Sequence, residues 1–280
     1  MKFLFLFLFS IISYSQKIIV VDSLSKENLP FANITLKKDN DEILKDYLNE
    51  NGTYLIDKNK SFTHISISNL GYNPKEIMRN RVKDTIFLVP KINLIEEVLV
   101  TKNIKNNFSI VGLVNERKHQ EFDLGKGVEK VIFIKNEFNI EKRIKSILLK
   151  IKKTGKGKIA FRIHLYENNN MIPGNNLLDE NIISYLDEKK MSITEIDISD
   201  LSLIFPKEGV FVGIENVGII DADFNNKIRV EYNQSLNSQI TFIRNTLKKE
   251  QWNDINEEFK KLNILKYKNK LNANFAIKVY

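Results

Sequence analysis

The sequence predicts an all-β protein built from two β-sandwich domains. Short apolar runs with period-two alternation recur along the chain, and turns rich in Gly, Pro and Asn separate them. These runs follow one another at the spacing of about 8–12 residues that is typical of sandwiches. The 280 residues, of which 42% are hydrophobic, are enough for one or two buried cores.

Residues 1–15 predict a signal peptide. Lys2 supplies a positive charge, residues 3–9 are Phe and Leu only, Ile11 and Ile12 extend the apolar run, and small residues precede a cleavage between Ser15 and Gln16. The run is shorter than the about 17–20 residues of a membrane-spanning helix, and no comparable run follows. We therefore expect an exported chain without a transmembrane segment, in the periplasm or at the outer membrane or cell surface.

Residues 16–100 are expected to form the first, smaller sandwich. Ala32, Ile34 and Leu36 alternate with polar residues, as in a strand with one buried face. Asn51-Gly52 is a strong indicator of a hairpin turn. The expected strands are residues 17–21, 32–36, 54–56, 62–70, 85–88 and 98–100.

Several motifs of this region occur in a recognisable order. They are Leu29-Pro30-x-Ala32-x-Ile34-x-Leu36, Asn51-Gly52-Thr53-Tyr54, Ile65-x-Ile67-Ser68-x-Leu70-Gly71-Tyr72 and Leu94-x-Glu96-Glu97-Val98-x-Val100. In this order they resemble the carboxypeptidase regulatory-like domain, a transthyretin-like module of seven strands common in exported proteins of Bacteroidetes-type bacteria. The resemblance implies structural roles for these residues, because the module accompanies carboxypeptidases and is not their catalytic part.

The segment 101–120 is polar and is predicted to be a linker with one short strand near residues 108–111. Residues 121–280 are expected to form a larger, jelly-roll-like sandwich. This half resembles an uncharacterised β-sandwich domain that is often paired with the first module.

The clearest alternation of the chain lies in residues 159–166. Ile159, Phe161, Ile163 and Leu165 share one face, whereas Arg162, His164 and Tyr166 share the other. Residues 140–151 are apolar at period two as well, and the glycines of residues 153–158 lie between the two runs. We expect the two runs to pair as a hairpin. Residues 248–262, around Trp252, have the composition of a helix.

Charge and cysteine content exclude several classes of function. The net charge is +8, but only 7 of the 43 basic residues are arginine, and lysine and glutamate are interspersed. A nucleic-acid-binding protein favours arginine and a basic stripe, so we expect no nucleic-acid partner. The chain has no cysteine, which excludes disulfides, cysteine zinc sites, a thiol nucleophile and a lipidated cysteine.

Two motifs suggest metal sites, and neither fits. His164 and Glu167 have the spacing of zinc ligands in carboxypeptidases, but residues three apart on a strand point to opposite faces. The chain is therefore not expected to be a zinc carboxypeptidase. Asp221, Asp223 and Asn225 are spaced like a calcium loop, but Asn226 replaces its glycine and Tyr232 its bidentate glutamate. We expect no cofactor, with an adventitious calcium site as the alternative.

Exposed aromatic side chains give the remaining indication of function. Tyr166, on the polar face of its strand, and Trp252 are the candidates for stacking on a ligand. We expect an exported, non-enzymatic cell-envelope protein that binds a glycan or a protein. One alternative is a glycan-acting hydrolase with an unrecognised site, for which Glu195 and Asp197 share a strand face. The other is an accessory subunit of an outer-membrane transport or adhesion assembly.

Overall fold

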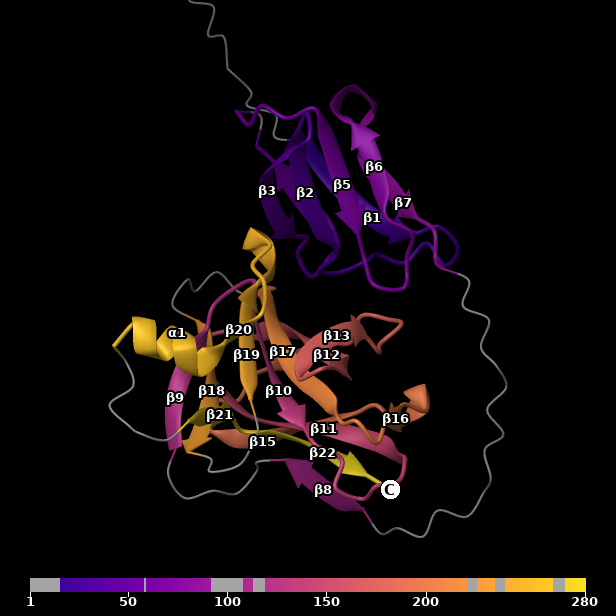
Figure 1. Ribbon diagram of the computed structural model, residues 1–280. Helices are drawn as coiled ribbons and strands as arrows, with labels where there is room; N and C mark the ends of the chain where they lie inside the picture. The colour runs from indigo at the N-terminus through magenta and orange to yellow at the C-terminus, as the bar shows by residue number, and fades with distance from the viewer. Residues whose placement is uncertain are drawn as a thin grey trace, which may run out of the picture.

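The computed structural model describes residues 16–57, 59–91, 108–112, 119–220, 226–234, 240–263 and 270–280. In these residues the protein is all-β and consists of two sandwiches (Figure 1). The expected fold class is confirmed. Among the described residues, no helix is long and apolar enough to span a membrane.

The first sandwich has seven strands among the described residues 16–91, and they form two sheets. One sheet has the order β4-β1-β7 and the other β3-β2-β5-β6. Ile34 and Leu36 of β2 and Ile65 and Ile67 of β5 are buried between the sheets, as their alternation predicts. The strands are β1 (Gln16–Asp22), β2 (Asn33–Lys38), β3 (Asp41–Tyr47), β4 (Thr53–Ile56), β5 (His64–Ser68), β6 (Lys75–Met78) and β7 (Thr85–Leu88).

The second sandwich is built from a seven-stranded and an eight-stranded sheet within the described residues. The first has the order β13-β12-β17-β10-β19-β20, with β14 paired to β12. The second has the order β21-β18-β11-β22-β8, with β15 and β16 paired to β11 and β9 to β18. Its strands are β8 (Ser109–Gly112), β9 (His119–Leu124), β10 (Val128–Ile134), β11 (Lys142–Thr154), β12 (Ile159–Asn169), β13 (Ile172–Asn176), β14 (Ile183–Leu186), β15 (Ser192–Asp197), β16 (Ile204–Phe205), β17 (Val210–Ile219), β18 (Lys227–Gln234), β19 (Thr241–Asn245), β20 (Asn253–Asp254), β21 (Leu271–Ala273) and β22 (Phe275–Val279).

The expected hairpin between residues 140–151 and 159–166 is wrong. Both segments are strands, but β11 pairs with β15, β16, β18 and β22, whereas β12 pairs with β13, β14 and β17. Gly155 and Gly157, both with positive φ, let the chain cross from one sheet to the other. Because the two strands face one core from opposite sides, their apolar alternation is the same as that of a hairpin.

The turn at Asn51-Gly52 likewise connects two sheets and is not a hairpin. The strand before it, β3, pairs with β2, while β4 pairs with β1. Gly52 has φ +66°, and a Cβ atom there would lie 3.1 Å from Val20 O and from Leu29 N. Glycine is therefore required at this turn, because three backbone segments pass close to one another there.

Three short segments complete the second sandwich. The strand expected near residues 108–111 is β8, and it pairs with β22. The helical prediction for residues 248–262 is correct only at its ends, which hold part of the 3-10 helix η3 (Thr246–Lys248) and the helix α1 (Ile255–Lys261). Trp252 lies between them, outside any helix.

The two sandwiches pack against each other (Figure 1). Phe31 and Tyr47 of the first sandwich form a small buried cluster with Ala160 and Val217 of the second. Leu70 packs on the core of the second sandwich. The neighbouring Gly71 has φ +82°, and a Cβ atom at this position would lie only 2.7 Å from Asp179 O of the second sandwich. The Leu70-Gly71 turn is thus part of the interdomain contact.

Gly213, in the middle of β17, is expected to tolerate no side chain. A Cβ atom at this position would lie 2.0 Å from Lys130 O and 2.6 Å from Val131 Cγ1. We expect Gly213→Ala to lower the free energy of unfolding by about 3 kcal/mol through overpacking, measured by urea denaturation. Gly125→Ala is the control, because its nearest heavy atom, Val128 Cγ2, is at an ordinary 3.7 Å. Equal stability of the two variants would contradict this account of the sheet.

Candidate functional site

The outer face of the seven-stranded sheet carries a buried polar stripe. Arg162, His164 and Tyr166 alternate along β12 on this face, as predicted, while Phe161, Ile163 and Leu165 point into the core. Neighbouring strands add Glu129 from β10, Glu215 from β17 and Arg244 from β19. The two arginines and the two glutamates among them are charged residue types that are rarely buried without a partner.

Glu215 is the centre of this stripe. It is 1% exposed, and both carboxylate oxygens accept hydrogen bonds. Oε2 lies 2.8 Å from Arg162 Nη1 and 3.2 Å from His164 Nε2. Oε1 accepts from the Tyr47 hydroxyl and lies 2.5 Å from Thr246 Oγ1. We call Glu215, Arg162, His164, Tyr47 and Thr246 the Glu215 cluster.

The Glu215 cluster joins the two sandwiches directly. Tyr47 belongs to the first sandwich, and the second nitrogen of Arg162, Nη2, donates to the backbone oxygen of Phe31 at 2.7 Å. Further contacts between the two sandwiches surround Tyr47 and the Arg162–Phe31 hydrogen bond. They are Lys45 Nζ to Thr246 O at 2.7 Å, Lys126 Nζ to Asp46 Oδ1 at 2.5 Å, Lys249 Nζ to Glu42 Oε1 at 2.9 Å and Asn181 to Asn69.

Beyond His164 the stripe continues to Trp252. Tyr166 donates to Glu129 Oε1 at 2.7 Å, and Arg244 donates to Glu129 Oε2 at 2.8 Å and to the Tyr166 hydroxyl at 2.9 Å. The Arg244 guanidinium lies 4.0 Å from the Trp252 ring centroid, in a cation–π contact. A continuous polar path thus runs from the first sandwich to the indole.

The charges of this stripe are fixed by their neighbours. Burial alone would raise the pKa of Glu215, but the charge of Arg162 and hydrogen bonds from His164 and Thr246 outweigh it and hold the pKa well below its usual range. Burial and the Glu215 charge raise the pKa of Tyr47, and burial and the Glu129 charge raise that of Tyr166. Glu215 is therefore ionised and both phenols are neutral.

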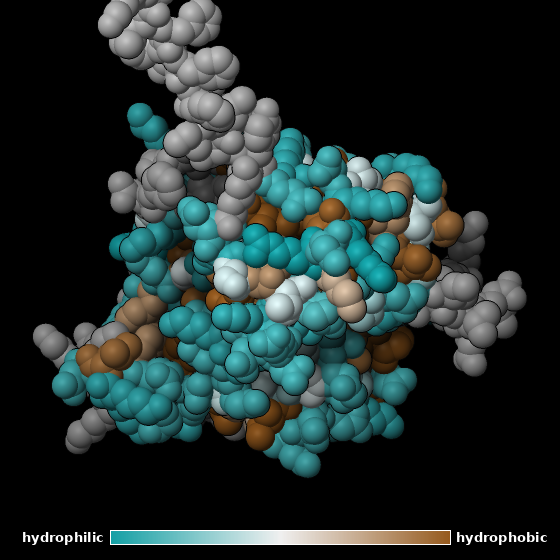
Figure 2. Space-filling view, turned by 90° about the horizontal axis from the view of Figure 1, so that it is seen from above, coloured by the Kyte–Doolittle hydropathy of each residue, from teal (hydrophilic) through white to brown (hydrophobic). Residues whose placement is uncertain are grey.

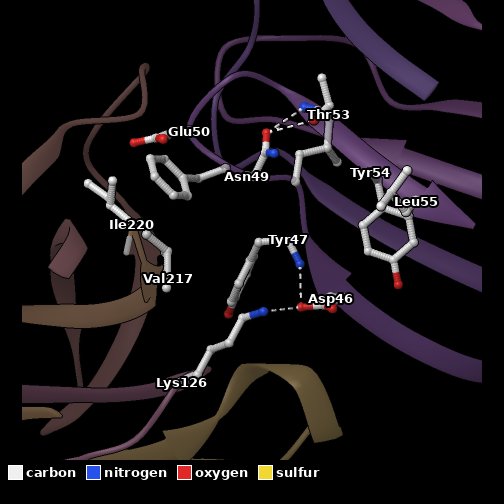
Figure 3. A pocket seen from close by; sticks show the side chains of 13 residues that line it. Asp46, Tyr47, Asn49, Glu50, Thr53, Tyr54, Leu55, Lys126, Val217 and Ile220 are labelled. Atoms are coloured by element: carbon white, nitrogen blue, oxygen red, sulfur yellow. Dashed lines mark hydrogen bonds and ion pairs between the residues drawn. The ribbon is translucent and has the colours of Figure 1, made fainter. Parts of the chain in front are cut away.

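Next to the Glu215 cluster lies an interdomain groove of about 470 Å³ (Figure 3). Asn49, Glu50 and Thr53 line one rim, Tyr54 and Leu55 lie on one side, and Val217 and Ile220 come from the opposite sandwich. Tyr47 and the Lys126–Asp46 ion pair also line the groove. Leu55 is 63% exposed, so the groove offers apolar surface to solvent.

The structure brings Tyr166 and Trp252 together. Their ring centroids are 5.7 Å apart, with the rings edge to face. The expectation that Tyr166 is exposed is wrong, because it is 5% exposed and its hydroxyl bonds within the polar stripe. Trp252 is half-buried and covers the apolar part of the outer sheet face, beside Phe211 and Phe133. A ligand-binding role of the pair stays a prediction.

Most of the other predicted site positions fall outside the described residues. Asp221, Asp223, Asn225 and Ser15 lie outside the described residues, and Gln16 is the first residue of β1. Within the described ranges no group of three metal-ligating side chains converges.

The two pairs considered from the sequence, His164 with Glu167 and Glu195 with Asp197, are engaged in other contacts. Glu167 accepts from Asn175, whereas His164 contacts Glu215, Glu129 and Tyr166, so the two side chains share no partner among these contacts. Glu195 accepts from Ser146 Oγ at 2.6 Å and pairs with Lys278, and these contacts lower its pKa. Asp197 accepts from Ser199 Oγ, which lowers its pKa as well. A glycosidase acid needs the opposite shift.

Sequence reasoning missed Glu129 and Glu215. Each is a glutamate within a strand of otherwise mostly apolar residues, Val128–Ile134 and Val210–Ile219. A charge in such a run indicates a buried pair, since lone charges are not buried. The partner across the sheet, and Tyr47 from the other sandwich, follow only from the three-dimensional arrangement.

Comparison with known proteins gives low similarity. No protein-family model and no curated protein matches the chain. The cysteine protease and lectin-like domains of Cwp84, a surface-layer-associated protein of Clostridium difficile, are 13% identical with a TM-score of 0.41, over 64% of this chain and 37% of that one. A clostridial Cwp84 after propeptide cleavage is 10% identical with a TM-score of 0.42, over 89% of this chain and 65% of that one. A structure of infectious bursal disease virus, Gt strain, is 8% identical with a TM-score of 0.25, over 94% of this chain and 64% of that one. Similarities of this size support no inference about function.

We expect Tyr47 and Glu215 to be energetically coupled. Glu215→Gln leaves Arg162 buried without its counter-charge, which costs about 3–5 kcal/mol, whereas Tyr47→Phe removes one hydrogen bond to a charged group, worth about 1.5–3 kcal/mol. In a double-mutant cycle, followed by urea unfolding with Trp252 fluorescence, the two losses should not add. Strict additivity would show that the two side chains do not interact.

Glu215 should also make the stability acid-sensitive. Its pKa is lower in the folded chain than the ordinary value of 4.5, so the unfolded chain binds the proton first as the pH falls. The contribution of Glu215 is therefore complete above pH 4.5 and is lost progressively below it. Urea unfolding between pH 3 and 6 should show a shallower pH dependence for Glu215→Gln than for the wild type. Identical slopes would contradict the assignment.

Proposed function

We propose that this protein is an exported, non-enzymatic binding protein of the cell envelope, and that the interdomain groove binds a short glycan. The observation that carries the proposal is the composition of the groove, which exposes apolar side chains beside carboxylates, an amide and an ammonium group. Sugars present apolar C–H faces together with hydroxyl groups that donate and accept hydrogen bonds, and such a lining suits both.

Individual side chains of the groove have distinct uses for such a ligand. Leu55 and Tyr54 supply the apolar side, and burial with the nearby Asp46 and Asp57 raises the pKa of Tyr54 to about 12, so its hydroxyl remains a donor. Glu50 is exposed at the rim, where its carboxylate can accept hydrogen bonds from the hydroxyl groups of a ligand. Lys126, held by Asp46 at 2.5 Å, donates from the other sandwich.

The size of the groove favours a small ligand over a folded protein. Its volume of about 470 Å³ lies in the range of small-molecule sites, about 300–1,000 Å³. A stable protein interface needs about 800 Å² from each partner. The face seen in Figure 2 is mostly hydrophilic, with hydrophobic side chains in separate small patches.

The buried carboxylates support binding rather than hydrolysis. Glu129 and Glu215 are at most 1% exposed, and each pairs with an arginine. A glycosidase needs two accessible carboxyl groups flanking the bond that it cleaves. We therefore assign these two glutamates to holding the sheet and the domains, with the groove beside them as the ligand site.

Export and family membership are parts of the same proposal. The predicted signal peptide of residues 1–15 supports export, and the ordered motifs of residues 29–72 support a carboxypeptidase regulatory-like first domain. In this proposal the first sandwich supplies the Asn49–Leu55 side of the groove, and the second sandwich completes it. The function then belongs to the pair of domains and to neither domain alone.

Substitution of Leu55 tests the groove. We expect residues 16–280 to bind short envelope glycans on a glycan array, and Leu55→Ser to weaken the best ligand about tenfold, the effect of losing roughly 1.4 kcal/mol of apolar contact. Leu24→Ser is the matched control, because Leu24 is 78% exposed and does not line the groove.

Calorimetric titration of both variants with the best array ligand measures the effect. A selective loss in Leu55→Ser supports the groove as the site. Equal affinity of the two variants, or no glycan bound by the wild type, would contradict the proposal.

A further inference from the structure

Lys150, Glu231 and Asn274 meet on the eight-stranded sheet, where the chain passes from one neighbouring strand to another. β21 pairs with β18 and β22 pairs with β11, and Asn274 lies between β21 and β22. Asn274 N donates to Glu231 O at 2.8 Å, and Lys150 N donates to Asn274 O at 3.0 Å. These backbone bonds fix the three residues side by side.

The three side chains lie on the outer face of this sheet and contact one another. Their neighbours along the chain belong to the core, and successive side chains of a strand point to opposite faces. These core neighbours are Leu149, Ile151, Val230, Tyr232, Ala273 and Phe275. Glu231 Oε1 lies 2.7 Å from Lys150 Nζ and accepts from Asn274 Nδ2 at 2.8 Å. One carboxylate oxygen thus contacts both an amine and an amide.

The amide of this cluster is shielded from water. Glu231 and Asn274 are each 1% exposed, and Asn274 Oδ1 has no hydrogen-bond partner among the described residues. Buried polar atoms without a partner are rare in native proteins, and a chemical role is one of the reasons for them. The side chain of Lys150 is 23% exposed, so the cluster opens to solvent at its amine end.

We propose that Lys150 and Asn274 become joined by an isopeptide bond, with Glu231 as the group that moves the protons. The Lys150 ammonium gives a proton to Glu231, and the resulting amine attacks Asn274 Cγ. The bond that forms joins Nζ to Cγ, and the bond that breaks joins Cγ to Nδ2. One hydrogen of the ammonium remains on the new amide. Glu231 passes the other two to Nδ2, which leaves as an ammonium ion, so the reaction needs no oxidant or reductant.

The geometry supplies both requirements of this reaction. The backbone bond between Lys150 and Asn274 holds the amine beside the amide, which removes most of the entropic cost of bringing them together. Glu231 Oε1 is within hydrogen-bond reach of the nitrogen that loses protons and of the nitrogen that leaves, as a general base and acid must be. Lys152, two residues along the same face, differs, because its partner Glu121 contacts a second cation, Arg229.

The bond would connect distant parts of the chain. It joins the middle of β11 to the segment that leads into the last strand, β22. A cross-link between residues far apart in sequence restricts the unfolded chain, as a disulfide does, and this chain has no cysteine with which to form one. The inference concerns the second sandwich alone and does not depend on glycan binding.

Tryptic digestion and mass spectrometry of residues 16–280 test the bond. We expect a branched peptide that joins Ser146–Lys152 to Leu271–Lys278, uncleaved after Lys150 and lighter by one ammonia than the two peptides together. The digest is needed to locate the loss, because an N-terminal glutamine such as Gln16 also releases ammonia when it cyclises. Recovery of the two segments only as separate peptides would overturn the proposal.

Three variants test the roles of the side chains. Lys150→Arg should abolish the branched peptide, because the guanidinium stays protonated, and Glu231→Gln should slow its formation at least about a hundredfold. Lys152→Arg is the matched control and should retain it, and both arginines preserve the tryptic sites. A branched peptide that forms in Glu231→Gln as fast as in the wild type, or that is lost in Lys152→Arg, would overturn the assignment. Lys150→Arg keeps the charge beside Glu231, so its result stands even where Glu231→Gln does not fold.

Discussion

The buried carboxylate of Glu215 is the group on which the two-domain structure depends. A carboxylate in the middle of a sandwich strand loses the solvation that water gave it, which is a cost of several kcal/mol. Here Arg162, His164, Tyr47 and Thr246 offset that cost, and one of the four comes from the other sandwich. The first sandwich therefore completes the solvation of a charge that the second sandwich carries, and separating the two would expose the deficit.

This arrangement explains why the outer face of a sheet is polar and yet buried. In a sandwich that stands alone, such a face is solvated. Here the first sandwich covers one end, through the cluster of Phe31, Tyr47, Ala160 and Val217, and Trp252 covers the other. The polar stripe runs between the two covers. The groove lies at the edge of the first cover, so its lining from two domains is a consequence of the same docking.

Much of the fold is visible in the sequence, because strand alternation is a local property. The two faces of β12, the core positions of β2 and the turn at Gly52 follow directly from residue order. Pairing between strands is not local, and β11 and β12 show the difference. Their alternation is that of a hairpin, but they face one core from opposite sheets.

The candidate site likewise combines features that local spacing predicts with contacts that depend on the three-dimensional arrangement. Arg162, His164 and Tyr166 share a face because of their spacing, whereas the contact between Tyr166 and Trp252 joins residues far apart in the sequence. The burial of Tyr166 depends on Glu129, Arg244 and Trp252, which are distant in the sequence. Glu215 could have been noticed as a charge inside an apolar strand, but its tie to Tyr47 depends on how two domains meet. No local pattern encodes that contact.

Small-angle X-ray scattering of residues 16–280 at neutral pH, with and without Glu215→Gln, tests most directly whether Glu215 holds the two sandwiches as one body. The account predicts that the wild-type curve fits the docked pair of domains, and that the variant has a larger radius of gyration because the first sandwich is released. A wild-type curve that requires two independently moving domains, or a variant as compact as the wild type, would contradict it.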